Sequence, residues 1–227
     1  MNGAEGKVVS LNIGKPKMFV YQGKELETGI FKEPVAQRLY LTKLNFTGDG
    51  QADLINHGGS DKAVCVYSHE HYPYWEQALQ RPLSVAAFGE NLTVSGLLEQ
   101  DVCIGDLYQL GEAVVQVSQP RQPCHKLAKR YDVRDMPLRL QNTGYTGFYF
   151  RVIEEGWVAP DESIVLLKRH PMQVTVAQAN HYMHQDKHNL PEIRRILEIA
   201  ELSQSWRHTF TRRLSGEATD SQKRLQG

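Results

Sequence analysis

Cys124 has the sequence surroundings of a reactive thiol. It follows two prolines in residues 117–126 (VSQPRQPCHK), which hold the preceding backbone extended and restrict the directions in which the thiol can point. Arg121, His125 and Lys126 lie beside it, and a helix is predicted to begin at the cysteine. Cationic neighbours and a helix N-terminus favour the thiolate, which attacks electrophiles or binds soft metals. The alternative is a small buried hydrophobic residue, the role of most lone cysteines.

A glycine pair followed by a lysine in residues 57–64 (HGGSDKAV) is a second candidate site. This composition can present backbone N–H groups and one cation to an oxyanion. A Walker A loop is excluded, because Asp61 and Ala63 stand where that loop needs a glycine and a hydroxyl residue. A tight turn capped by Asp61 explains the same residues equally well.

Two further segments combine glycines with polar side chains. Thr28 and Lys32 could bind a terminal phosphate, although an exposed lysine beside a glutamate is more often solvated surface. In residues 88–97 (FGENLTVSGL), Glu90 and Asn91 could orient a ligand or hold a turn, and the structural role is favoured.

Zinc is the competing metal, with two candidate sets of ligands. Cys65, His69 and His71 form one set, and three histidines predicted to share a helical face form the other: His181, His184 and His188. Neither set has a recognised zinc spacing with enough ligands, and the three histidines also fit a polar surface face.

The elements that must position these residues are mostly short strands. Residues 7–13, 63–67, 91–94, 107–110, 113–118 and 163–167 are β-rich and separated by glycine, proline and aspartate turns. Such closely spaced strands favour a barrel over a parallel sheet. The sequence therefore predicts a mainly β fold with some α structure, in which a β-barrel domain (residues 1–170) precedes a small three-helix domain (residues 171–227).

Helices are predicted at five places. Residues 68–79 open with the N-cap candidate Ser68 and contain Pro73, which limits regularity, and residues 124–130 form a second helix that extends towards residue 140. Three helices are predicted in the C-terminal domain, around residues 174–179, 190–202 and 203–214. The last of them starts at Ser203 and stops at Gly216.

Composition limits the classes of function. Lysine plus arginine equals aspartate plus glutamate at 26 each, so no overall field attracts nucleic acid or an anionic membrane. No apolar run approaches the length of a membrane helix and no secretory signal opens the sequence, so we expect a cytoplasmic protein with free thiols. A DNA-binding role for the C-terminal helices is weak, because residues 170–227 hold eight lysines and arginines against six acids.

Four ordered motifs together resemble the MOSC domain, which is named for the C-terminal domain of molybdenum cofactor sulfurase. These are residues 57–64, 88–92, 104–106 and 118–124, and residues 141–152 with the helical tail resemble the YiiM subgroup. The resemblance implies a β-rich domain that binds the molybdenum cofactor and reduces N-hydroxylated compounds, such as 6-N-hydroxylaminopurine, to amines, thereby detoxifying them. A carrier of cofactor or sulfur without turnover is the alternative.

The resemblance also implies roles for single residues. Cys124 matches the family cysteine and would be a thiolate ligand of molybdenum. The residues that would hold the cofactor's phosphate and pterin are Thr28, Lys32, His57, Gly58, Gly59, Lys62, Asn91 and Arg121. His125 is the candidate proton donor, since its ordinary pKa lies near physiological pH.

Electrons for the implied reaction must come from outside the chain. No GxGxxG fingerprint for a flavin or nicotinamide occurs, so the resemblance leads us to expect a separate flavin-containing reductase as electron donor. The other expected partner is a small N-hydroxylated substrate, with no nucleic acid and no membrane. Whether the chain forms a homodimer is left open by the sequence.

Overall fold

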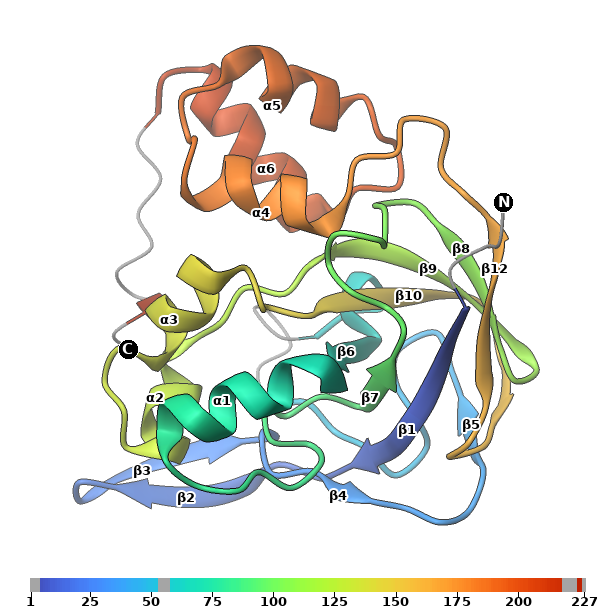
Figure 1. Cartoon of the computed structure of the whole chain (residues 1–227), viewed down its shortest axis with the longest axis vertical. Helices are drawn as coiled ribbons and strands as arrows, with labels where there is room; N and C mark the ends of the chain where they lie inside the picture. The colour runs from blue at the N-terminus through green and yellow to red at the C-terminus, as the bar shows by residue number, and fades with distance from the viewer. Residues whose placement is uncertain (1–4, 53–57, 218–223, 226–227) are drawn as a thin grey trace.

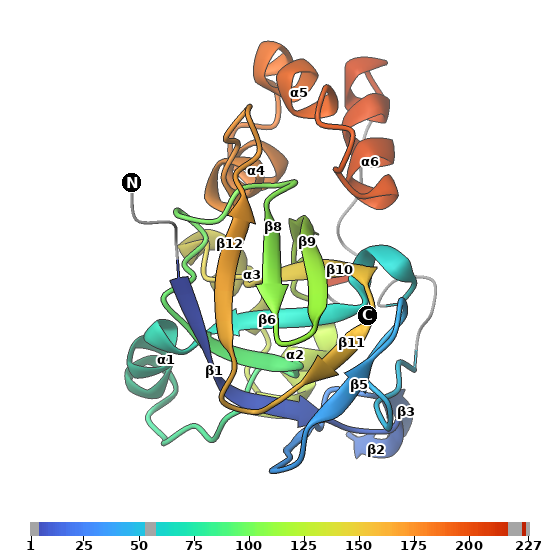
Figure 2. The ribbon, with the colours of Figure 1, turned by 90° about the vertical axis from the view of Figure 1, so that its right-hand side faces the viewer.

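The centre of the molecule is a closed β-barrel. The computed structural model describes residues 5–52, 58–217 and 224–225. Within these residues the strand order is β12-β8-β9-β10-β6-β7-β1, and pairing of β12 with β1 closes a seven-stranded barrel (Figures 1 and 2). The barrel strands are β1 (Glu5–Ile13), β6 (Val64–Ser68), β7 (Leu92–Ser95), β8 (Leu107–Leu110), β9 (Ala113–Pro120), β10 (Phe148–Glu154) and β12 (Ser163–Lys168). The predicted barrel is thus confirmed.

Adjacent barrel strands are antiparallel except for β6 and β7, which are parallel. Smaller pairings surround the barrel: β4 (Glu33–Pro34) adds to β1, and β5 (Leu39–Leu41) pairs with β11 (Gly156–Val158). A hairpin of β2 (Lys17–Tyr21) and β3 (Lys24–Thr28) turns at Gln22 and Gly23. Both turn residues have positive φ, as a two-residue hairpin with the native strand twist requires.

The first predicted helix begins later than expected. Ser68 is the last residue of β6, and its hydroxyl donates to the Leu97 carbonyl instead of capping a helix. A 3-10 turn, η2 (His69–His71), leads into α1 (Tyr72–Leu79). Pro73 therefore lies in the first turn of α1, where its missing N–H costs nothing, and does not disturb the helix interior.

The helix after Cys124 is also shorter than predicted. It runs as α2 (His125–Tyr131) and ends at Asp132, which adopts a left-handed conformation with φ 54°. A separate helix, α3 (Met136–Thr143), follows it. The left-handed residue reverses the chain, so one continuous helix to residue 140 does not form.

Three C-terminal helices are present as predicted and lie together at one end of the barrel (Figure 1). They are α4 (Val176–His184), α5 (Leu190–Leu197) and α6 (Gln204–Leu214). The predicted cap is confirmed, since Ser203 Oγ accepts the Trp206 N–H at 3.4 Å. Gly216 has φ 76° just beyond α6, and α5 stops several residues before the predicted 202.

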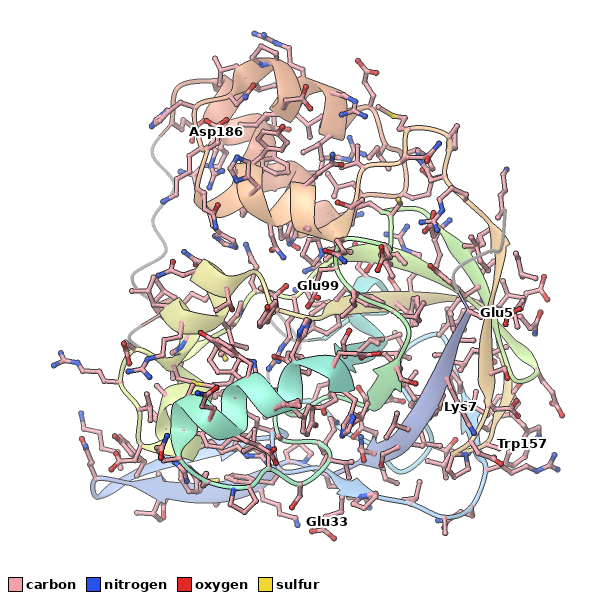
Figure 3. All side chains as sticks on the ribbon, viewed as in Figure 1. Glu5, Lys7, Glu33, Glu99, Trp157 and Asp186 are labelled. Carbon is pink, nitrogen blue, oxygen red and sulfur yellow. The ribbon has the colours of Figure 1, made fainter. Side chains whose placement is uncertain are left out.

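Apolar packing joins the helices to the barrel. One cluster of buried residues includes Val117 and Phe150 of the barrel together with Val176, Ile193 and Phe210 of the helices. A second cluster fills the space between α1, α2 and α3. Glu99, labelled in Figure 3 where the helices meet the barrel, is buried with Oε2 2.7 Å from His71 Nε2 and Oε1 accepting the Gly147 N–H.

In the part of the chain that is described, the helices are all too short or too polar to cross a membrane.

Candidate functional site

A pocket of about 580 Å³, counted with its open mouth, lies where the β2–β3 hairpin approaches the start of β6, the end of β9 and the start of α2. Six predicted site residues line it: Thr28, Lys32, Lys62, Asn91, Arg121 and Cys124. Strands and loops far apart in the sequence thus deliver these side chains to one cavity.

Cys124 occupies the position just before the first residue of α2. Its backbone is extended, with φ −126° and ψ 167°. The side chain is 7% exposed and lines the pocket. The prolines, the extended backbone and the helix start are therefore combined as the sequence predicted, and the thiol reaches a cavity instead of packing in the apolar core.

Arg121 is a buried cation at the same wall. Its Nη2 donates to the Phe88 carbonyl at 2.6 Å, and among the residues described Nη1 has no hydrogen-bond partner. Burial opposes the charged form, but Cys65, Tyr149 and Cys124 nearby raise the pKa of Arg121 above its ordinary value, so the guanidinium stays charged. No carboxylate in the described part of the chain lies within ion-pair distance of it.

Lys32 and Asn91 are both tied to Asp49, a residue that the sequence did not single out. Lys32 Nζ forms an ion pair with Asp49 Oδ1, and both side chains are almost fully buried. Asn91 Nδ2 donates to Asp49 Oδ2 at 2.8 Å and to the Asn12 carbonyl at 3.3 Å. The hydrogens of the Asn91 amide are thus used by the protein, and the lysine already has a counter-ion. Asn91 stands beside Glu90, whose buried carboxylate accepts the Phe88 N–H and the Tyr72 hydroxyl, a structural role.

Cys65 and Tyr149 also line the pocket and were missed as a pair. They are opposite each other in the β6–β10 register. Burial raises the pKa of both groups. Only strand pairing brings them together, so no local sequence signal marks them.

The remaining predicted residues are less central. Thr28 Oγ1 accepts the Ile30 N–H at 3.2 Å, which shapes the turn after β3. Gly58 and Gly59 are described but do not belong to the lining, and a Cβ at Gly59 would meet nothing within 4 Å. His57 lies outside the described residues.

His125 belongs to a different depression from Cys124. This second hollow lies between the β2–β3 hairpin and α2 and includes Tyr21, Lys24, Lys129 and Asp132. Consecutive residues at a helix start point about 100° apart, so adjacency to Cys124 does not place the imidazole in the same pocket.

The candidate zinc ligands do not lie close together in the structure. Within the described ranges there is no group of three His, Cys, Asp or Glu side chains able to hold a metal ion. His69 is exposed, whereas His71 is buried against Glu99. The prediction that the three histidines of the second set share one helical face is wrong, because α4 ends at His184 and His188 lies beyond it.

Two family models match the chain. The MOSC domain model matches residues 53–165, and the model described as YiiM-like, 3-alpha helix domain matches residues 174–217. The first range contains most of the barrel and the Cys124 loop, and the second contains the C-terminal helices.

Similar proteins agree with both matches. The uncharacterized protein YflK of Bacillus subtilis (strain 168) is 59% identical over 206 residues, 91% of this chain and 93% of that protein. Protein YiiM of Escherichia coli (strain K12) is 41% identical over 226 residues, covering 98% and 96%. A protein named Reductase from Gibberella moniliformis is 36% identical over 151 residues, which are 65% of this chain but 27% of that protein.

The crystal structure of YiiM from Geobacillus stearothermophilus superposes with a TM-score of 0.80 at 41% identity, covering 92% of this chain and 99% of that one. The likeness extends through the barrel and the helical domain. The chain therefore belongs to the MOSC domain family, in the YiiM-like branch that carries a C-terminal three-helix domain.

Proposed function

We propose that this protein is a molybdenum cofactor-dependent reductase that converts N-hydroxylated compounds, such as 6-N-hydroxylaminopurine, to the corresponding amines. Family membership and the relative named Reductase support an oxidoreductase. The observation that carries the proposal is the buried Arg121 guanidinium, whose Nη1 has no partner among the described residues, in the same pocket as Cys124.

The residues of the pocket fit an anionic cofactor. A buried cation without a counter-ion is costly, so Arg121 favours a bound anion. The lining residues that the structure describes include four cations and no carboxylate: Lys32, Lys62, Arg121 and Lys126. Gly29, Gly50 and Gly89 line the pocket where chain segments pack closely, since a Cβ at Gly89 would lie 2.7 Å from the Ile30 side chain. The Cys124 thiolate adds the soft donor that molybdenum accepts.

Each of these pocket residues would then have its own role. Cys124 would hold the metal, while Arg121 with Lys62 and Lys126 would bind the anionic part of the cofactor, and Thr28, Asn91 and the Lys32–Asp49 pair would shape the surrounding wall. When bound, the cofactor supplies the two-electron chemistry. The overall reaction consumes the N-hydroxy compound, two electrons and two protons and yields the amine and water. A separate flavin-containing reductase provides the electrons.

The test compares two cysteine variants of protein made in a host that synthesises the cofactor. Cys124→Ala should lose molybdenum, measured by elemental analysis, and should lose reduction of an N-hydroxylated purine with a chemical reductant. Cys103→Ala is the matched control, because Cys103 is also buried but lies against Arg169, outside the pocket. An alanine variant at 124 with full molybdenum and full turnover would disprove the ligand role. Wild-type protein that holds molybdenum without any turnover would instead indicate a carrier.

A further inference from the structure

The N-terminus of α6 contacts two segments of the barrel that carry pocket residues. This helix begins beside the end of β9, where the Ser203 N–H donates to the Ser118 carbonyl, and runs away from the barrel into the C-terminal domain (Figure 1). One segment is the 3-10 turn η1 (Ser60–Lys62), which brings Lys62 to the pocket. The other is the end of β9, which leads directly to Arg121 and Cys124.

Asp61 makes the contact from the first segment. Its Oδ2 accepts the backbone N–H of Gln204, the first residue of α6, at 2.9 Å. Its Oδ1 accepts from Arg151 Nε at 3.1 Å and Arg151 Nη2 at 2.5 Å. The carboxylate thus satisfies a helix N–H that has no intrahelical partner, and its charge is favourable at that helix end. The Asp61 carboxylate therefore binds Arg151 and the start of α6, although Lys62 follows it directly in the chain.

The end of β9 makes the second contact. Ser118 accepts the Ser203 N–H through its carbonyl at 3.0 Å, and Ser205 Oγ donates to Gln119 Oε1 at 3.0 Å. Ser118 Oγ donates to the Asp61 carbonyl at 2.5 Å. The two pocket segments are therefore joined to each other as well as to the helix.

From this geometry we infer that the three-helix domain holds the pocket segments in place. Asp61 is the positioning residue, because its contact with the start of α6 fixes Lys62 relative to Arg121 and Cys124. The inference deepens the proposed function and rests on it for the identity of the anion. It assigns the C-terminal domain the task of setting the distance between the cations that hold the anionic part of the cofactor.

The test measures anion binding by cofactor-free full-length protein, with inorganic phosphate as the probe in calorimetry or amide NMR. Asp61→Asn should raise the Kd for phosphate by roughly tenfold, which corresponds to a loss of about 1.4 kcal/mol of binding. Ser205→Ala, at an exposed position compatible with folding, should raise it in the same direction by a smaller factor. Glu201→Gln is the control, because it removes a helical-domain carboxylate that contacts His170 and touches no lining residue.

Molybdenum content of the same variants, purified from a cofactor-competent host, is the second readout and should fall in the same order. The inference is overturned if Asp61→Asn and Ser205→Ala bind phosphate and retain molybdenum as well as Glu201→Gln does. If phosphate binding depends on Asp61 but the wild-type protein holds no molybdenum, the proposed function fails and the positioning role survives. Wild-type protein that binds neither phosphate nor molybdenum would refute both.

Discussion

Cys124 and His125 are neighbours in the chain but belong to different hollows of the surface. One group with a transferable proton that shares the Cys124 pocket is Tyr149, which lies opposite Cys65 in the β6–β10 register. Burial and the nearby Cys65 raise the pKa of Tyr149, so its hydroxyl is protonated near neutral pH and would be available as a proton donor. Arg121 beside it would stabilise a transient negative charge on the phenol oxygen.

This placement predicts which residue matters for proton delivery. Tyr149→Phe should lower kcat about 100-fold, the lower end of the effect of general acid catalysis, with molybdenum content unchanged. His125→Gln should lower kcat far less. Steady-state kinetics with a chemical reductant, together with elemental analysis, separates the two. The reverse order of effects would return the proton donor to His125.

At the scale of single elements, α4 contains His184, a titratable residue whose buried position disfavours its charged form. His184 packs edge-on against Trp206 with ring centroids 6.4 Å apart, and its Nε2 has no partner among the described residues. Burial, with further contributions from Arg224 and Arg213, lowers the pKa of His184 from 6.5 to about 3. The folded protein therefore holds this imidazole neutral where the unfolded chain would be protonated.

The consequence is a loss of stability in acid. Between pH 6.5 and about 3 the unfolded state binds a proton that the folded state does not, so the free energy of unfolding falls as the pH is lowered, by up to about 1.4 kcal/mol per pH unit. Urea titrations of wild-type protein and His184→Gln at pH 7, 6 and 5 measure this. The variant should show the shallower decline, and parallel curves would contradict the assignment.

At the scale of the whole molecule, the barrel and the helices share one apolar cluster. Phe210, Trp206 and Ile193 of the helical domain are fully or almost fully buried in the same cluster as Val117 of β9. Backbone bonds add to this, since the Val176 N–H donates to the Val102 carbonyl at 2.9 Å. The boundary predicted near residue 170 therefore cuts through a common core.

A chain ending at residue 170 should consequently not fold on its own, because removing the helices exposes the end of the barrel core to water. We expect it to be aggregated or to lack cooperative unfolding by circular dichroism. A chain ending at residue 217, which keeps all three helices, is the control and should unfold in a single transition. A soluble, cooperatively unfolding barrel alone would show that the two parts are independent.

Local patterns in the sequence determined many of the elements. β-rich runs between turn residues marked the barrel strands other than β10, and the cap at Ser203 and the stop at Gly216 marked α6, because such signals depend on backbone hydrogen bonds within a few residues. Pro120 and Pro123 likewise restrict the backbone of Gln119 and Gln122, the residues before them in the segment that leads to Cys124. Ordered motifs then identified the family.

The tertiary structure alone decided which side chains share the pocket. Cys65 meets Tyr149 through pairing of β6 with β10, Lys32 meets Asp49 across a loop, and Asp61 meets the start of α6 143 positions away. Contacts between residues so far apart produce no periodic pattern in the sequence, because they depend on strand register and on helix packing. The sequence therefore named the cysteine and several cations, and the packing of distant segments decided which of them share one pocket and added Cys65 and Tyr149 to it.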